Sequence, residues 1–144
     1  MATEPQKHIL LAEDNPGDVQ LLQYAVLTYG RLSWCIYRVA DGEAALAFLR
    51  QEGVYAGMPR LDLALLDIGL PRRDGWEVLR LLRTLPRLAT LPVVMLTGVL
   101  TPRDEAQCVA LRPQACLVKP MKIEDYRHVV EAIEQQLDVS ARSG

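Results

Sequence analysis

Acidic, hydroxyl and amine side chains follow four short apolar segments of the chain. These side chains are the acidic pair Glu13 and Asp14, the carboxylate Asp67, the hydroxyl of Thr97 and the amine of Lys119. Carboxylates that meet in one place repel one another unless a cation lies among them, and oxygen ligands suit Mg²⁺. A lysine and a hydroxyl beside a metal-bound carboxylate suit the oxygens of a phosphoryl group. These residue types therefore indicate phosphoryl transfer to an aspartate, which is a form of nucleophilic catalysis.

Each of these residues has an ordinary interpretation when it is taken alone. Acidic residues are favoured just before a helix, so Glu13 and Asp14 need not have a further role. An aspartate or a threonine after a strand is usually a turn residue, and a lone lysine is usually solvated. The functional interpretation is favoured because all of them follow predicted strands.

The segment around Asp67 is the most informative part of the chain. Residues 63–66 form a continuous apolar run, which is typical of a strand that is buried on both faces. The run ends on Asp67, and the glycine and proline that follow stop the strand. Asp74 then caps a helix, with Glu77 three residues later as in a capping box. Asp67 is therefore expected at the carboxyl end of a central strand, where open α/β sheets bind their ligands.

The rest of the chain alternates strands and helices. Strands are expected at residues 8–12, 33–39, 62–66, 92–96 and 115–118, and helices are expected to begin near Asn15, Asp41, Asp74, Thr101 and Tyr126. The last helix has the clearest period, with apolar residues Tyr126, Val129, Val130, Ile133 and Leu137 on one face. This order predicts an α/β fold, in which a doubly wound, five-stranded parallel sheet has helices on both faces.

Length, charge and cysteine content exclude several classes of function. A chain of 144 residues suits one domain, and a net charge of −2 with a pI near 5.7 argues against nucleic acid or an anionic membrane as a partner. No apolar run is long enough to span a membrane. The three cysteines are odd in number and lack metal-ligand spacing, so we expect reduced thiols in a cytoplasmic protein.

Six segments make the chain similar to the receiver domain of two-component response regulators. They lie at residues 10–16, 41–46, 66–71, 74–79, 92–97 and 118–120. The resemblance covers residues 7–137 and leaves residues 1–6 and 138–144 as short tails. It implies the flavodoxin-like strand order 2-1-3-4-5. The Glu-Asp-Asn-Pro-x-Asp opening and the extended loop before the central strand are most similar to the single-domain regulators associated with cyanobacterial and bacterial phytochromes.

The resemblance assigns a metal site. Glu13 and Asp14 match the acidic pair that holds Mg²⁺ together with the acceptor aspartate, here Asp67. The backbone carbonyl of Gly69 matches a further ligand. No other cofactor is expected.

The resemblance also assigns the groups that handle the phosphoryl group. Asp67 matches the aspartate that accepts it from a histidine kinase. Thr97 matches the hydroxyl that binds its oxygens and moves on activation, and Lys119 matches the lysine that pairs with it. The bond between Lys119 and Pro120 is expected to be cis, as the family implies. The aromatic residue that the family often has three positions before the lysine is replaced by Cys116, so an aromatic switch is not expected here.

The implied function is that of a stand-alone response regulator, which relays a signal by a conformational change when Asp67 is phosphorylated. It is not expected to be an enzyme, although it would support its own Mg²⁺-dependent phosphorylation and dephosphorylation. The expected partners are a sensor histidine kinase, with a bacteriophytochrome as a candidate, and a second copy of the chain, bound through the fifth strand and the last helix.

Two alternative functions belong to different classes. A receiver-like module that is not phosphorylated and only binds proteins is the first, and the complete set of site residues argues against it. An Asp-nucleophile hydrolase of the haloacid dehalogenase type is the second. It would need another aspartate two residues after Asp67, where Gly69 stands.

Overall fold

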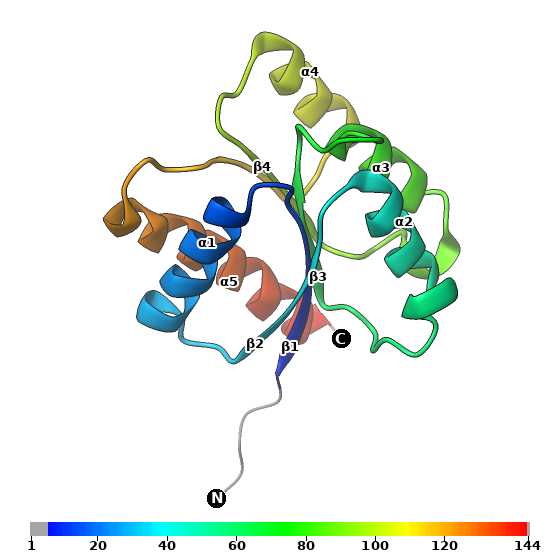
Figure 1. Ribbon diagram of the computed structural model, residues 1–144, viewed down its shortest axis with the longest axis horizontal. Coiled ribbons are helices and arrows are strands. Elements are labelled where there is room, and N and C mark those ends of the chain that lie inside the picture. Colours follow the sequence, from blue (N-terminus) through cyan, green and yellow to red (C-terminus); the bar gives the residue numbers. More distant parts are fainter. Residues whose placement is uncertain (1–5, 144) are drawn as a thin grey trace, which may run out of the picture.

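A five-stranded parallel sheet forms the centre of the molecule in the computed structural model, which describes the backbone of residues 6–143 and the side chains of residues 6–137 (Figure 1). The strands are β1 (Lys7–Ala12), β2 (Trp34–Val39), β3 (Leu63–Asp67), β4 (Val93–Thr97) and β5 (Ala115–Val118). Their order across the sheet is β2-β1-β3-β4-β5, and every neighbouring pair is parallel. The predicted fold class and strand order are therefore confirmed.

Five α-helices connect or follow the strands, and their starts depend on short side chains. The helices are α1 (Pro16–Tyr29), α2 (Gly42–Arg50), α3 (Gly75–Leu82), α4 (Pro102–Leu111) and α5 (Tyr126–Ser143). The first four begin where the sequence predicts, because Asn15, Asp41, Asp74 and Thr101 each accept hydrogen bonds from backbone N–H groups of the first turn.

The sheet separates two hydrophobic cores because side chains alternate along each strand. Leu10 and Leu66 face the core that includes α2 and α3, whereas Ile9 and Leu65 face the core that includes α1 and α5. Figure 1 shows α1 and α5 on one side of the sheet and α2 and α3 on the other. The apolar face predicted for α5 is buried along its whole length from Tyr126 to Leu137, as expected.

The predicted capping box at the start of α3 is only half formed. The Glu77 N–H donates to Asp74 Oδ1 at 2.9 Å, but the Glu77 carboxylate lies 3.5 Å from Arg73 Nη1, which competes for it. The reciprocal box forms instead at α4, between Thr101 and Asp104. Helix α3 ends at Leu82, and a 3₁₀ turn (Pro86–Leu88) follows.

Domain boundaries and cellular location stay predictions. Residues 1–5 of the predicted amino-terminal tail lie outside the described part of the chain, and the backbone of α5 continues to Ser143. Among the described residues, no helix combines the length and the apolar character needed to cross a bilayer.

Gly75 lies where the first turn of α3 approaches the end of β3. A Cβ atom at this position would collide with the backbone oxygen of Asp67 and would lie 3.0 Å from Ile68 Cα. The Gly75 N–H also donates to the Ile68 carbonyl at 2.9 Å. The absence of a side chain therefore lets α3 fix the backbone that carries Asp67.

Substituting Gly75→Ala should lower the free energy of unfolding by about 1–3 kcal/mol, because the added methyl group must push backbone apart. Gly57→Ala is the matched control, because Gly57 is exposed and has no atom within 4 Å of an added Cβ. It should change stability by no more than about 0.5 kcal/mol. Chemical denaturation followed by circular dichroism measures both variants, and equal midpoints would contradict the close packing of α3 on β3.

Candidate functional site

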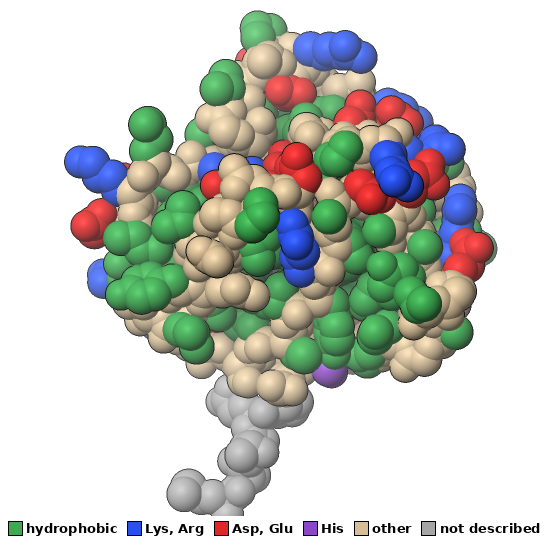
Figure 2. Space-filling model, viewed as in Figure 1, with side chains coloured by type: hydrophobic (Ala, Val, Ile, Leu, Met, Phe, Trp, Pro, Cys, Tyr) green, Lys and Arg blue, Asp and Glu red, His purple; other side chains and the backbone are tan. Residues whose placement is uncertain are grey.

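The carboxyl edge of the sheet brings the predicted site residues together. Asp67 and Thr97 are the last residues of β3 and β4, and Glu13 and Asp14 directly follow β1, the neighbour of β3. Lys119 directly follows β5, and its N–H donates to the Thr97 carbonyl at 2.7 Å. Figure 2 shows acidic and basic side chains gathered in the upper part of this view, above the ends of the strands. Parallel strands place their carboxyl ends at one edge, so the convergence follows from the fold.

Lys119 is the centre of the charge cluster. Its Nζ lies 2.7 Å from Asp67 Oδ2 and 3.0 Å from Asp18 Oδ2, and it also pairs with the Glu13 carboxylate. Only 12% of the lysine side chain is exposed. Burial opposes its positive charge, but hydrogen bonds to Asp67, Glu13 and Asp18 outweigh burial and raise the pKa of Lys119. The ammonium group therefore stays charged and holds the acidic groups close together.

Glu13 is the most deeply buried carboxylate at this edge, with 2% of the residue exposed. Burial is the main reason that the pKa of Glu13 rises to about 7, and the hydrogen bond and charge of Asp67 act in the same direction. Lys119 and the N–H of Asn15, which donates to Glu13 Oε2 at 3.1 Å, oppose the rise without cancelling it. Glu13 is thus a carboxylate that lacks enough positive charge around it.

A divalent cation fits this donor set. Glu13, Asp14 and Asp67 each offer an oxygen, and these oxygens lie within 4.8 Å of one another. Glu13, Asp18 and Asp67 share the single ammonium of Lys119, and Asp14 adds a further carboxylate beside Glu13 and Asp67. Oxygen ligands with uncompensated negative charge are the type of site that Mg²⁺ or Mn²⁺ takes. The role of the Gly69 carbonyl stays a prediction, whereas the Gly69 N–H donates to Asp67 Oδ1 at 2.9 Å.

Thr97 lies at the same edge, but its hydroxyl is turned toward the loop after β4. Its Oγ1 donates to the Val99 carbonyl at 2.8 Å, and the residue is 9% exposed. The structure therefore brings Asp67 together with Glu13, Asp14 and Lys119, and it places the Thr97 hydroxyl in a bond with the loop.

Two residues that sequence reasoning did not assign to the site contribute to it. Asp18, in the first turn of α1, contacts Lys119. Arg38 donates from Nε to the Glu13 carbonyl at 2.9 Å and from Nη2 to the Asp14 carbonyl at 3.3 Å. The signals available were a second acid four residues after Asp14 and a charged residue within the otherwise apolar strand β2.

The bond between Lys119 and Pro120 was expected to be cis, and this expectation is wrong. None of the peptide bonds in the described residues is cis. The energetic preference between the two isomers is small before proline, so the sequence alone does not determine which isomer a folded loop adopts.

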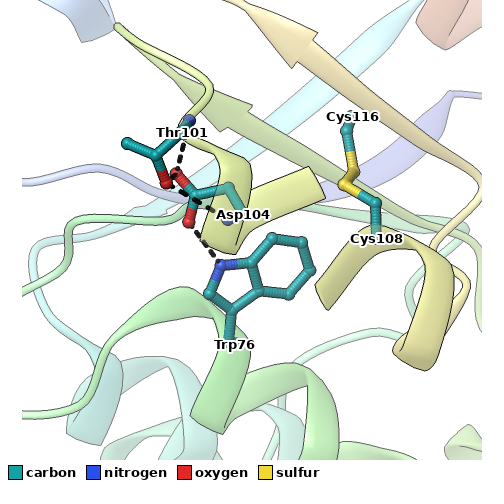
Figure 3. Close-up of a disulfide and its surroundings, with 5 residues drawn as sticks. All are labelled: Trp76, Thr101, Asp104, Cys108 and Cys116. Atoms are coloured by element: carbon teal, nitrogen blue, oxygen red, sulfur yellow. Dashed lines mark hydrogen bonds between the residues drawn. A yellow bond between two sulfur atoms is a disulfide. The ribbon is translucent and has the colours of Figure 1, made fainter. Parts of the chain in front are cut away.

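The expectation of three reduced thiols is also wrong. Cys108 and Cys116 form a disulfide, with their Cα atoms 6.8 Å apart, whereas Cys35 is free and half-buried (Figure 3). Pro113 ends α4 and the chain reverses into β5, so the last turn of the helix lies beside the strand. An odd number of cysteines does not exclude one such pair, and the sequence spacing gave no sign of it.

Comparison with known proteins gives consistent results. The family model described as "Response regulator receiver domain" matches residues 9–131. The chain is 38% identical to response regulator Rcp1 of Synechocystis sp. (strain ATCC 27184 / PCC 6803 / Kazusa), over 92% of this chain and 89% of that protein.

Two solved structures are similar in fold. One is the phosphorylated cyanobacterial phytochrome response regulator RcpA, with a TM-score of 0.82 and 37% identity over 91% of this chain and 93% of that chain. The other is the Mn²⁺-bound form of Rcp1, with a TM-score of 0.80 and 37% identity over 90% and 92% of the two chains.

Binding of a divalent cation should strengthen as the pH rises through 7. Below this pH, a proton occupies Glu13 in the metal-free protein, and a cation must displace it. We expect the affinity for Mg²⁺ to be about tenfold higher at pH 8 than at pH 6. Isothermal titration calorimetry in two buffers of different ionisation enthalpy would also detect the released proton. Equal affinity at both pH values, with no proton released, would contradict the assignment of Glu13.

Proposed function

The chain belongs to the family of response regulator receiver domains, and from this premise we propose that it accepts a phosphoryl group on Asp67 from a sensor histidine kinase. The single observation that supports Asp67 as the acceptor is its position. Its carboxylate is at the end of the central strand β3, bonded to Lys119 Nζ and to the Gly69 N–H, and beside the acidic pair. No other described carboxylate is bonded to both a lysine and the N–H of Gly69.

In the proposed reaction, a carboxylate oxygen of Asp67 attacks the phosphorus of a phosphohistidine. A P–O bond forms, the P–N bond breaks, and the histidine nitrogen leaves with the electron pair. Transfer of this kind needs positioning and charge neutralisation more than covalent help. Lys119 already lies 2.7 Å from Asp67 Oδ2 and supplies positive charge, and the Gly69 N–H orients the other oxygen. Both groups are fixed by the strand ends before the donor arrives.

We assign the metal to Glu13, Asp14 and Asp67, with Mg²⁺ as the proposed ion. When bound, the ion would neutralise charge on the phosphoryl oxygens and orient them. Arg38 supports this arrangement indirectly, because it holds the backbone carbonyls of Glu13 and Asp14 and thereby fixes the loop that carries both acids. The same groups would support the protein's own dephosphorylation, with water as the acceptor.

Thr97 is the proposed link from Asp67 to the surface. Its hydroxyl proton is committed to the Val99 carbonyl, so binding of a phosphoryl oxygen would require that bond to break. The loop between β4 and α4 would then lose one of its contacts with the strand. This change is a two-state event of the type that regulators use to alter a binding surface.

For partners, we propose a histidine kinase of the phytochrome class, since RcpA is described as a phytochrome response regulator. We also propose a homodimer through β5 and α5. β5 is an edge strand with one neighbour, and Val118 at its end and Met121 just beyond it are 49% and 98% exposed. An edge strand with exposed apolar side chains is suited to pairing with another chain. The complete site argues against a non-phosphorylated binding module.

Replacing Asp67→Asn should abolish labelling by acetyl phosphate and Mg²⁺, because the amide has nearly the same shape but is not a nucleophile. Intact-mass spectrometry should detect one added phosphate on the wild type and none on the variant. Asp125→Asn is the matched control, because Asp125 is exposed and lies outside the cluster. Circular dichroism would verify that both variants fold, and full labelling of folded Asp67→Asn would refute the acceptor assignment.

Light scattering at micromolar concentration should give the mass of a dimer, and Met121→Glu should shift it toward the monomer by placing a charge at the edge of β5. Val54→Glu is the control, because Val54 is 86% exposed in the 3₁₀ turn Gly53–Tyr55 after α2. The measurement is made with and without beryllofluoride as a phosphoryl mimic. A monomer in both conditions would rule out the dimer.

A further inference from the structure

Among the helices that pack on the sheet, α4 is the least firmly packed. None of its residues is buried, and neither is any residue of β5, the edge strand beside it. By contrast, α3 buries five residues, among them Val78, Leu79 and Leu82. Helices are stabilised mainly by the apolar face that they bury, and in α4 only partly buried residues such as Cys108 and Leu111 pack against the core, so other contacts gain importance.

Two specific links hold α4 at its two ends (Figure 3). At the amino-terminal end, the Trp76 indole Nε1 of α3 donates to Asp104 Oδ1 at 3.0 Å, and Asp104 completes the capping box with Thr101. At the carboxyl-terminal end, the Cys108–Cys116 disulfide joins the last turn of α4 to β5. The disulfide is therefore the covalent one of the two links that hold α4 against α3 and β5.

We propose that Cys108 and Cys116 are a reversible thiol–disulfide site, whose oxidant is a small-molecule disulfide of the glutathione class, and that the bond fastens α4 to β5. Both cysteines are half-buried rather than enclosed, so a small disulfide can reach a sulfur atom. The inference concerns α4 and β5, and it goes beyond the phosphorylation of Asp67.

The exchange is balanced without any other reactant. One cysteine thiolate attacks a sulfur of the oxidant RSSR, forms a mixed disulfide and releases one thiolate RS⁻. The second cysteine thiolate then attacks the sulfur of the first cysteine and releases the second RS⁻. Two thiols of the protein are oxidised, one RSSR is reduced to two RSH, and an excess of RSH reverses both steps.

The position of Cys116 places the disulfide close in the fold to Thr97 and Lys119. In the β4–β5 ladder, Cys116 is paired with Met95, two residues before Thr97, and it lies three residues before Lys119. The disulfide thus ties α4 to β5, which leads into Lys119 and pairs with the strand that ends on Thr97. If Asp67 is phosphorylated as proposed, the oxidised form should restrain the movement of the loop at residues 98–101 and of α4.

Equilibration in glutathione buffers tests the reversible bond. After alkylation, intact mass should show one modified cysteine in excess oxidised glutathione and three in excess reduced glutathione. Peptide mapping should place the pair at Cys108 and Cys116, and Cys35→Ser should still form it, whereas Cys108→Ser should not. Failure of the pair to form, failure of reduced glutathione to open it, or pairing through Cys35 would each overturn the proposal.

Hydrogen–deuterium exchange tests the fastening of α4. The amides of α4 should exchange about tenfold faster in the reduced wild type than in the oxidised form, while those of α3 should not change. The Cys108→Ser variant should exchange like the reduced form under both conditions. Equal exchange of α4 in both redox states would overturn the fastening. Repeating both measurements on Asp67→Asn should give the same results, so they do not depend on the acceptor assignment.

Discussion

The ion cluster around Lys119 is the constraint on which the rest of the site depends. One ammonium group contacts carboxylates that come from the loop after β1, the first turn of α1 and the end of β3. Buried charges are tolerated only when they are paired, so the cluster can exist only if these three segments and the end of β5 are held in register. The parallel sheet supplies that register. Burial nevertheless raises the pKa of Glu13, because the bond to Lys119 does not fully offset the cost of removing its charge from water. This residual need for positive charge is what makes the edge suited to a divalent cation.

The elements around this cluster differ in how tightly they are packed. β3 and β4 are buried at every residue, and α3 approaches the Asp67 backbone so closely that Gly75 has no room for a side chain. The acceptor is therefore held firmly. On the other side of Thr97, α4 and β5 bury no residue, and the Thr97 hydroxyl is bonded to the loop that leads to them. A structural change at Asp67 and Thr97 would thus alter the position of the loosely packed α4 and β5 more than that of β3 and α3.

The surface formed by α4, β5 and the residues just after β5 has the composition of a surface that could bind another protein in a regulated way. Val118 and Met121 expose apolar area next to an unpaired strand edge, and a disulfide adds to the sparse apolar packing that attaches α4. Cys116 occupies the position where the family resemblance leads one to expect an aromatic ring. A ring at this position could be buried or exposed by rotation, whereas a cysteine bonded to α4 restrains the helix itself.

The sequence by itself determined the order of strands and helices, most of the helix starts and the residues at the carboxyl edge, because these depend on local periodicity and capping. Asn15, Asp41 and Thr101 could be identified as caps from their neighbours alone, and the end of β3 at Asp67 from the residues around it. The resemblance then supplied the strand order, which the structure has. The residue types at this edge predicted phosphoryl transfer to an aspartate, and the resemblance then assigned a role to each residue.

Only the tertiary structure decided how these residues meet. Asp18 and Lys119 are separated by 101 positions in the chain, and their contact depends on how α1 and the end of β5 pack against the same edge. The direction of the Thr97 hydroxyl, the trans bond before Pro120 and the pairing of Cys108 with Cys116 likewise depend on loop paths. Local sequence constrains such paths weakly because their alternatives differ by small energies, and long-range packing selects among them.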